Sequence, residues 1–126
     1  MKKTFISEQA KEFRTKYNLQ NSQTMGTRTY QKNLIVEEFK EVLEAEAQLW
    51  RKNIETHEDL LKELADLVYV CYQYAENMGW FLDEALDRVH KSNMSKLGED
   101  GKPIYREDGK VLKGPNYAPP NLEDLI

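Results

Sequence analysis

The stretch LLKELADLVYVCYQYA, residues 60–75, decides the fold of this chain. Its apolar residues cover most of the circumference of a helix, and a helix that is apolar nearly all round is a buried one. Thr56-His57-Glu58-Asp59 has the spacing of a capping box, and Gly79 is a common helix stop. The sequence therefore predicts a helix from about His57 to Met78 that other helices cover.

Three amphipathic helices are predicted around this central one. Apolar residues recur at steps of three and four over about Lys3–Asn18, Thr29–Lys52 and Phe81–Leu97, which is the period of a helix face. The polar segment Asn18–Thr27 is expected to be a loop, and Gly98 ends the last helix. The predicted fold class is all-α, a bundle of about four helices.

The last part of the chain changes character, because glycine, proline and aspartate become frequent. Ile104-Tyr105-Arg106 faces Val111-Leu112-Lys113 across Glu107–Lys110, a pattern that favours a short β-hairpin. Gly114-Pro115-Asn116 and Pro119-Pro120 favour an extended tail after it. We expect this tail to lie against another surface, because it cannot support itself.

Length and composition limit the classes of protein. One domain is expected over residues 1–126, with a helical core at 29–97 and the hairpin and tail at 99–126. A net charge of −4 and a pI near 5.3 argue against a nucleic-acid-binding face. The longest strongly apolar stretch, 67–75, is too short to cross a membrane, and no apolar signal region is expected. The single cysteine, Cys71, suits a reducing compartment, so we expect a soluble cytoplasmic protein.

Four acidic residues fall where the predicted helices are otherwise apolar. On the wheel of the second helix, Glu38 lies within the apolar arc and Glu41 lies at its edge. On the third helix, apolar residues bracket Glu63, and Asp66 lies one turn along on the same side. Two i,i+3 acid pairs on consecutive antiparallel helices can face each other, so we expect the four carboxylates to converge.

Convergence of four carboxylates would make a metal site built of oxygen atoms alone. Such a donor set favours Mg²⁺ or Mn²⁺ over Zn²⁺, and bundle sites for two irons use Glu-x-x-His pairs. Magnesium held by few carboxylates usually binds phosphate oxygens as well. On the fourth predicted helix, Asn93 and Lys96 intrude on the apolar side and could hold phosphate, although capping and snorkelling explain them equally well.

The order and spacing of these residues resemble a known motif pair. Glu37-Glu38-Phe39-Lys40-Glu41 followed by Glu63-Leu64-Ala65-Asp66 is similar to the EExxE and ExxD motifs of the all-α nucleoside triphosphate pyrophosphohydrolases. This MazG-like group also includes phosphoribosyl-ATP pyrophosphohydrolase. The later pair Asn93 and Lys96 fits the same pattern, and the likeness extends over about Leu34–Leu97.

The resemblance implies an enzyme with Mg²⁺ as cofactor that assembles as a homodimer or homotetramer. It implies cleavage of a nucleoside or deoxynucleoside triphosphate between the α and β phosphates, which gives the monophosphate and pyrophosphate. The implied metal ligands, which are also the implied catalytic carboxylates, are Glu38, Glu41, Glu63 and Asp66. The implied substrate-binding residues are Asn93 and Lys96, with further phosphate contacts open to Lys91, Lys102 and Arg106. Glu37 matches the motif, yet its wheel position turns it away from the other acids.

Two alternatives remain open at this point. The same site could act on phosphoribosyl-ATP, or the acids could belong to a non-catalytic helical interaction module. Base preference is also open, because core packing explains the aromatic residues Phe39, Trp50, Tyr72 and Tyr74 as well as base recognition does. Self-association is expected in every case, because the central helix needs more cover than three amphipathic neighbours supply.

Overall fold

The structure is a computed structural model that describes residues 5–126. Over this range it contains four α-helices, α1 (Ile6–Lys16), α2 (Met25–Glu46), α3 (Ile54–Met78) and α4 (Leu82–Met94), with the 3₁₀ turns η1 (Leu49–Arg51) and η2 (Glu123–Leu125). The all-α fold class is confirmed. The chain divides into two compact units, Met1–Trp80 and Phe81–Ile126. No helix in the described part is both long and apolar enough to cross a membrane.

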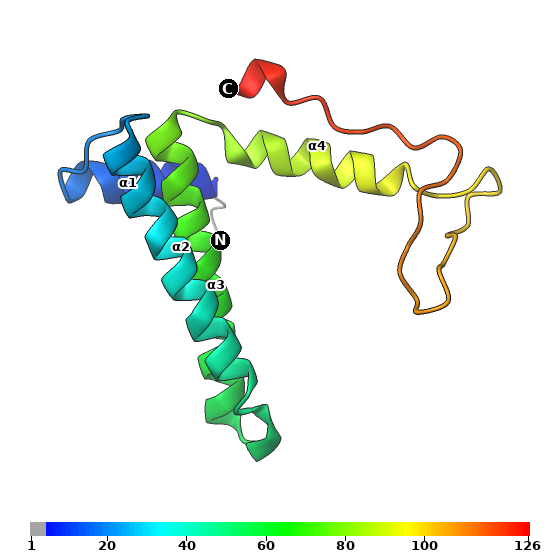
Figure 1. The fold of residues 1–126 in the computed structure, drawn as a ribbon, viewed down its shortest axis with the longest axis horizontal. Helices are drawn as coiled ribbons and strands as arrows, with labels where there is room; N and C mark the ends of the chain where they lie inside the picture. Colours follow the sequence, from blue (N-terminus) through cyan, green and yellow to red (C-terminus); the bar gives the residue numbers. More distant parts are fainter. Residues whose placement is uncertain (1–4) are drawn as a thin grey trace. The chain divides into compact units, whose positions relative to one another are not determined.

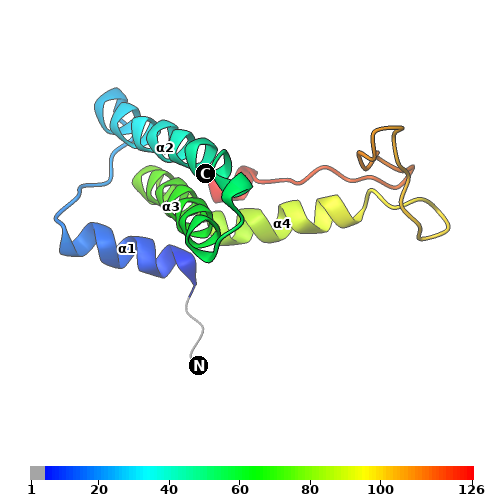
Figure 2. The same cartoon turned by 90° about the horizontal axis from the view of Figure 1, so that it is seen from below.

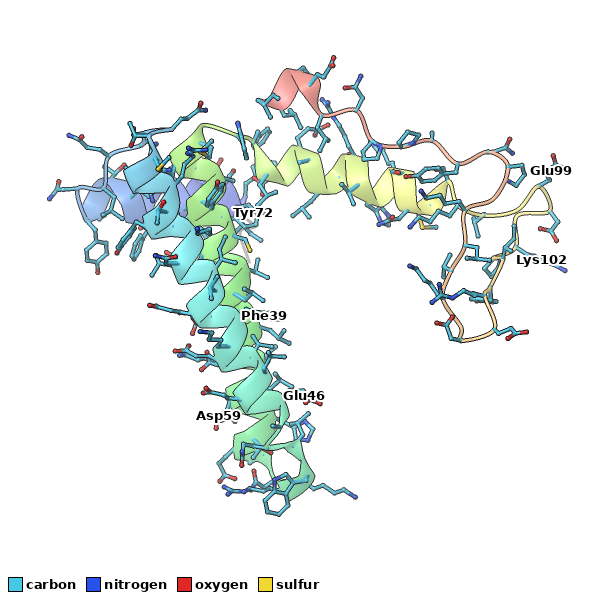
Figure 3. All side chains as sticks on the ribbon, in the orientation of Figure 1. Phe39, Glu46, Asp59, Tyr72, Glu99 and Lys102 are labelled. Atoms are coloured by element: carbon cyan, nitrogen blue, oxygen red, sulfur yellow. The ribbon has the colours of Figure 1, made fainter. Side chains whose placement is uncertain are left out.

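The first unit is built on the pair of helices α2 and α3. The chain runs down α2, turns at η1 and returns along α3, so the two helices are antiparallel (Figure 1). Helix α1 packs against α3 on the side away from α2 (Figure 2). Figure 3 shows side chains along the pair, with Phe39 and Glu46 on α2 and Asp59 and Tyr72 on α3. The helix pair is therefore the scaffold on which both acid motifs lie.

Helix α2 begins earlier and ends earlier than the sequence predicts. Residues 25–27, predicted as loop, form its first turn, where Gly26 costs little because the first N–H groups of a helix have no intrahelical acceptor. The Thr27 hydroxyl donates to the Ser22 carbonyl oxygen at 2.6 Å and ties this turn to the preceding loop. At the other end the chain tightens into η1 and reverses at Lys52, which has a φ of 45°. The predicted continuation to Lys52 is wrong.

The cap of helix α3 lies three residues before the first residue of the predicted capping box. The cap is Asn53, whose Oδ1 accepts a hydrogen bond from the Thr56 amide at 2.9 Å. Asparagine caps a helix as well as threonine does, and Thr56 instead donates its hydroxyl to the Asn53 carbonyl oxygen. The predicted stop at Gly79 is confirmed, because Gly79 has a left-handed φ of 78° that glycine adopts without strain.

Most buried residues of α3 lie near its C-terminal end. They are Tyr72, Gln73, Ala75, Glu76 and Asn77, and Thr56 in the first turn is also buried. Between these two parts several apolar residues of α3 are exposed, and they join those of α2 in what we call the open stripe, which consists of Val36, Phe39, Leu43, Leu61, Leu64 and Val68, all 44–68% exposed. The prediction of a helix covered all round is thus wrong for the isolated chain, since α1, α2 and the short turn η1 leave these residues of α3 exposed.

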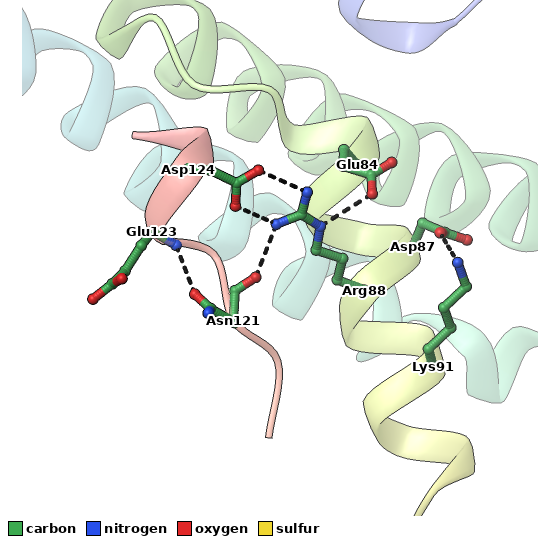
Figure 4. A network of polar contacts seen from close by, with 7 residues as sticks. All are labelled: Glu84, Asp87, Arg88, Lys91, Asn121, Glu123 and Asp124. Atoms are coloured by element: carbon green, nitrogen blue, oxygen red, sulfur yellow. Dashed lines mark hydrogen bonds and ion pairs between the residues drawn. The ribbon is translucent and has the colours of Figure 1, made fainter. Parts of the chain in front are cut away.

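The second unit consists of α4 and a long C-terminal segment. The Arg88 guanidinium on α4 donates to both carboxylate oxygens of Asp124 and to the Asn121 carbonyl oxygen (Figure 4). The Ala118 amide donates to the Ser95 hydroxyl oxygen at 2.9 Å. The tail predicted to lie against another surface therefore lies along α4, held by polar contacts.

The predicted β-hairpin is not formed. Residues 104–112 turn back on themselves, but they share one isolated bridge, Tyr105 with Val111, and no strand occurs in residues 5–126. The backbone groups that would extend the ladder have other partners: the Lys102 carbonyl oxygen accepts from Gly98 and the Gly114 amide donates to Lys96. A ladder needs these groups, so pairing stops after one bridge.

Candidate metal centre

Four carboxylates converge between α2 and α3. One carboxylate oxygen from each residue lies within 4.8 Å of the corresponding oxygens of the others, and the four residues are Glu38, Glu41, Glu63 and Asp66. The convergence expected from the helical wheels is therefore present. The role of these residues as metal ligands stays a prediction.

The antiparallel register of the two helices explains this convergence. Glu38 and Glu41 are three residues apart on α2, and Glu63 and Asp66 are three residues apart on α3, so each pair lies on one helix face. Because the helices run in opposite directions, the first acid of one pair lies across from the second acid of the other. Neither helix has a proline here, so the turns that carry the acids are regular.

Two of the carboxylate oxygens are buried without a partner. Glu38 Oε2 and Glu63 Oε2 have almost no solvent exposure and accept no hydrogen bond. A buried anionic oxygen without a donor is costly unless a proton or a cation compensates it. This is the observation that best fits the residues to a divalent cation, since all-oxygen carboxylate sites suit Mg²⁺ and Mn²⁺.

The acids perturb one another's protonation. A hydrogen bond with Glu38 is the main cause that raises the pKa of Glu41. Partial burial is the main cause that raises the pKa of Glu63, and its hydrogen bond with Glu41 adds to the effect. Neighbouring carboxylates thus share protons when nothing else neutralises them. A cation between them would remove the need for these protons.

One lysine partly compensates the cluster. Lys62 Nζ lies 2.8 Å from Asp66 Oδ2 and 3.5 Å from Glu63 Oε1. These two acids raise the pKa of Lys62, so its ammonium group stays charged. One positive charge against four acids leaves the centre strongly negative whenever the carboxylates are ionised.

An open cavity adjoins the centre towards the η1 end of the helix pair. It has a volume of about 590 Å³ and is lined by Glu41, Glu44, Gln48, Asp59 and Glu63 among others. A lining of this kind repels a phosphate group unless a cation lies between them. The arrangement therefore suits a phosphorylated ligand that arrives with divalent metal.

The remaining predicted residues do not belong to the cluster. Glu37 is exposed and is not among the clustered acids, as its wheel position indicates. Lys91 and Asn93 lie on α4 and Lys96 follows it, all within the second unit. Lys91 pairs with Asp87 at 2.9 Å. The substrate contacts expected of Lys91, Asn93 and Lys96 stay predictions.

Sequence reasoning missed a buried polar cluster in the first unit. Arg14 is 4% exposed, and its guanidinium donates to Gln73 Oε1 at 3.2 Å and to Asn77 Oδ1 at 3.4 Å. Gln31 on α2 is 3% exposed. The available signal was Gln73, a lone glutamine inside the apolar run that ends at Ala75.

An all-α chain that gathers four carboxylates on an antiparallel helix pair has the features of the helical, MazG-like class of nucleotide pyrophosphohydrolases. The sequence profile described as PRA-PH, phosphoribosyl-ATP pyrophosphohydrolase, matches residues 1–93. The chain belongs to this family, within the MazG-like superfamily. No curated protein is similar enough to the chain to count as a match. The family identifies the type of activity as pyrophosphohydrolase, a hydrolase of phosphoric anhydrides.

Proposed function

We propose that the protein is a Mg²⁺-dependent pyrophosphohydrolase that cleaves nucleoside or deoxynucleoside triphosphates between the α and β phosphates. The products are the nucleoside monophosphate and pyrophosphate. The observation that carries the proposal is the four-carboxylate cluster, with its two buried oxygens that have no partner. The family match supports the reaction type.

The protein side of the chemistry follows from the charges. Glu38, Glu41, Glu63 and Asp66 would hold the cation, which supplies neutralisation of phosphate charge and acidification of a water molecule. A carboxylate of the cluster would accept the proton of the attacking water, a role that suits Glu41, which is the exposed member of the four. Lys62 balances Asp66 without occupying the open side. Asn93 and Lys96 are proposed to contact phosphate.

Phosphoribosyl-ATP is the second candidate substrate. The family match favours it, because the matched profile carries this substrate in its description. The reaction is the same anhydride cleavage, so the acid cluster would serve it equally well. The two candidates differ in the base and its substituents, which the acids do not contact.

The experiment is pyrophosphate release from a panel of nucleoside triphosphates and phosphoribosyl-ATP, each with Mg²⁺, with Mn²⁺ or with EDTA. Glu38→Gln and Asp66→Asn should each abolish metal-dependent release while the helical circular dichroism is kept. Glu37→Gln is the matched control, because this neighbouring acid lies outside the cluster and should leave the rate nearly unchanged. Metal-independent release, or none from any substrate, would refute the proposal and favour a non-catalytic module.

We also propose that the chain self-associates through the open stripe. Its members on each helix are spaced by three and four residues, so they form one exposed apolar face on each helix, turned away from the acid side of that helix. Light scattering after size-exclusion chromatography should give a dimer or tetramer, and Phe39→Glu with Leu64→Glu should reduce it towards the monomer. A wild-type chain that is monomeric at high concentration would contradict this proposal.

A further inference from the structure

Two buried amides between α2 and α3 have polar atoms without partners. Gln31 is 3% exposed and Gln73 is 4% exposed, yet Gln31 Oε1 and Gln73 Nε2 have no hydrogen-bond partner. A buried donor or acceptor left unpaired costs free energy, so an unpaired set in one place points to a missing ligand. Both side chains line one half-open cavity, which we call the amide pocket.

Arg14 fixes which atom of Gln73 is free. An arginine can only donate, and its Nη1 donates to Gln73 Oε1 at 3.2 Å. The other end of the same amide, Nε2, must therefore be the donor that lacks a partner. The amide pocket thus offers a hydrogen-bond donor from α3 and an acceptor from α2, each held by a rigid helix.

The size and lining of the amide pocket suit a flat ring. Its volume is about 140 Å³, and apolar cavities of about 150 Å³ in other proteins hold a benzene molecule. The aromatic side chains Phe13, Tyr30 and Tyr69 line it, and Leu34 and Val70 complete its apolar wall. Aromatic rings stack on nucleobases of any sequence. A ring with a polar edge would satisfy both the apolar wall and the two free amide atoms.

The amide pocket lies along the same helix pair as the acid cluster. Gln31 precedes Glu38 by seven residues, and Gln73 follows Asp66 by seven, which is two turns or about 10 Å on each helix. Seven residues return to nearly the same face, so the amides and the acids line one seam of the pair. Leu34 and Val70 occupy the turn between them and line the same cavity. A ribose can bridge this interval between a base and its phosphates.

We propose that the amide pocket binds the base of the substrate and selects a pyrimidine. This inference rests on the proposed function, because it assumes a nucleotide whose phosphates lie at the acid cluster. Each nucleobase presents a hydrogen-bond acceptor beside a donor on its pairing edge, which complements Gln73 Nε2 and Gln31 Oε1, so the selection of a pyrimidine rests on the single ring that a cavity of about 140 Å³ accommodates. Uracil and cytosine both combine this donor and acceptor pair with a single six-membered ring.

We expect a purine to fit the amide pocket less well, because its second ring adds to the volume that a cavity of about 140 Å³ must hold. The neighbouring cavity of about 280 Å³ shares the lining residues Leu19, Tyr30 and Gln31. Phosphoribosyl-ATP carries a purine with an additional sugar phosphate, so the amide pocket disfavours it further. The pocket therefore separates the two candidate substrates of the proposed function.

The first test is kcat/KM with Mg²⁺ for the triphosphates of uracil, cytosine, thymine, adenine and guanine, and for phosphoribosyl-ATP. We expect a preference for pyrimidines over purines of at least about tenfold. Comparison of the uracil and cytosine triphosphates identifies the preferred base. Equal rates for purines and pyrimidines, or activity on phosphoribosyl-ATP alone, would overturn the inference while leaving the proposed reaction intact.

The second test changes the free donor without disturbing Arg14. Gln73→Glu keeps an oxygen for Arg14 Nη1 but replaces the Nε2 donor by an acceptor. We expect KM for the preferred pyrimidine triphosphate to rise on the order of tenfold with kcat little changed, because the lost contact binds substrate and transition state alike. Gln31→Met, which removes the acceptor at similar size, should act in the same direction. Gln9→Glu adds the same charge on an exposed face of α1 and serves as the control.

A binding measurement separates failure of this inference from failure of the proposed function. Calorimetric titration with the nucleosides uridine, cytidine, adenosine and guanosine in EDTA reports on the amide pocket without any turnover, because nucleosides carry no phosphate that the acid cluster would repel. Tighter binding of uridine or cytidine that Gln73→Glu weakens supports the pocket even if no triphosphate is hydrolysed. Absence of binding, nucleosides that bind with equal affinity, or a Gln73→Glu chain that binds them as the wild type does, would refute the assignment.

Discussion

Replacement of Arg14 by methionine should destabilise the first unit. Arg14 is 4% exposed and joins α1 to α3 through Gln73 Oε1 and Asn77 Oδ1. It also donates to Asn21 Oδ1 at 2.6 Å and to the Gln20 carbonyl oxygen at 3.2 Å. Methionine fills similar volume and removes every one of these donors.

The magnitude follows from which acceptors are left without a donor. Asn77 Oδ1 keeps the Ser22 amide at 3.1 Å, but Gln73 Oε1 loses the donor from Arg14. An orphaned buried acceptor costs about 1–3 kcal/mol, and bonds to a charged donor contribute about 1.5–3 kcal/mol each before desolvation is counted. Burial lowers the pKa of Arg14, which shows that the guanidinium itself is desolvated and offsets part of this gain. We expect a net loss of about 2–4 kcal/mol.

The assay is urea unfolding followed by circular dichroism at several protein concentrations, because association would add to the apparent stability. In a thermal scan of the same variant, a loss of this size should lower Tm by roughly 10 °C. Arg51→Met is the matched control, since Arg51 lies over the exposed Trp50 ring at 5.2 Å and makes no buried contact. A loss below about 1 kcal/mol for Arg14→Met would show that the polar cluster does not hold α1 on α3.

Four further predictions concern the metal centre and the second unit. The pKa values of Glu41 and Glu63 are raised, so both groups take up protons at a pH above the usual glutamate pKa of about 4.3. Protons compete with Mg²⁺ for these carboxylates, so the Kd for Mg²⁺ measured by calorimetry should increase as pH falls through this range. In the metal-free protein these groups should lower stability as pH rises through the same window, since the folded state binds more protons. Gly114→Ala should increase amide hydrogen exchange near Gly114, because a Cβ there would overlap the backbone carbonyl oxygens of Lys96 and Leu97. Gly26→Ala is the control, because a Cβ at Gly26 meets no atom. Arg88→Met should release the η2 turn to faster proteolysis without loss of helical signal.

The helices could be predicted from periodicity, but their ends could not. The period-3.6 pattern locates all four, and Gly79 marks an end because a positive φ is required there. The N-terminus of α3 depends on whether Asn53 or Thr56 caps it, and both residue types cap well. The turn at 104–112 fails as a hairpin because Lys102 and Gly114 bond elsewhere, and a local pattern does not contain such long-range competition.

The acid cluster could be predicted because its residues break an apolar pattern at helical spacing. The amide pocket could not, since Gln31 and Gln73 each appear as one polar residue on an otherwise apolar side of a helix, and spacing does not show which of their atoms are free. Its identification depends on Arg14, which is 59 residues away in sequence from Gln73 and orients that amide. Tertiary contacts of this kind decide which polar atoms are free, and sequence spacing alone does not.

The acid cluster and the amide pocket lie along the same side of the α2–α3 pair but differ in charge. The acid end repels every phosphate that arrives without a cation, so affinity there depends on metal. The amide end is neutral, and its hydrogen bonds neither add to the negative field nor change with the charge of the phosphates. Because Arg14 already bonds to Gln73 and Asn77, it gives phosphate no competing site there. Base selection and metal-dependent phosphate binding can therefore vary independently. If they do, the losses in nucleotide affinity caused by Gln73→Glu and by Glu38→Gln should add in the double variant.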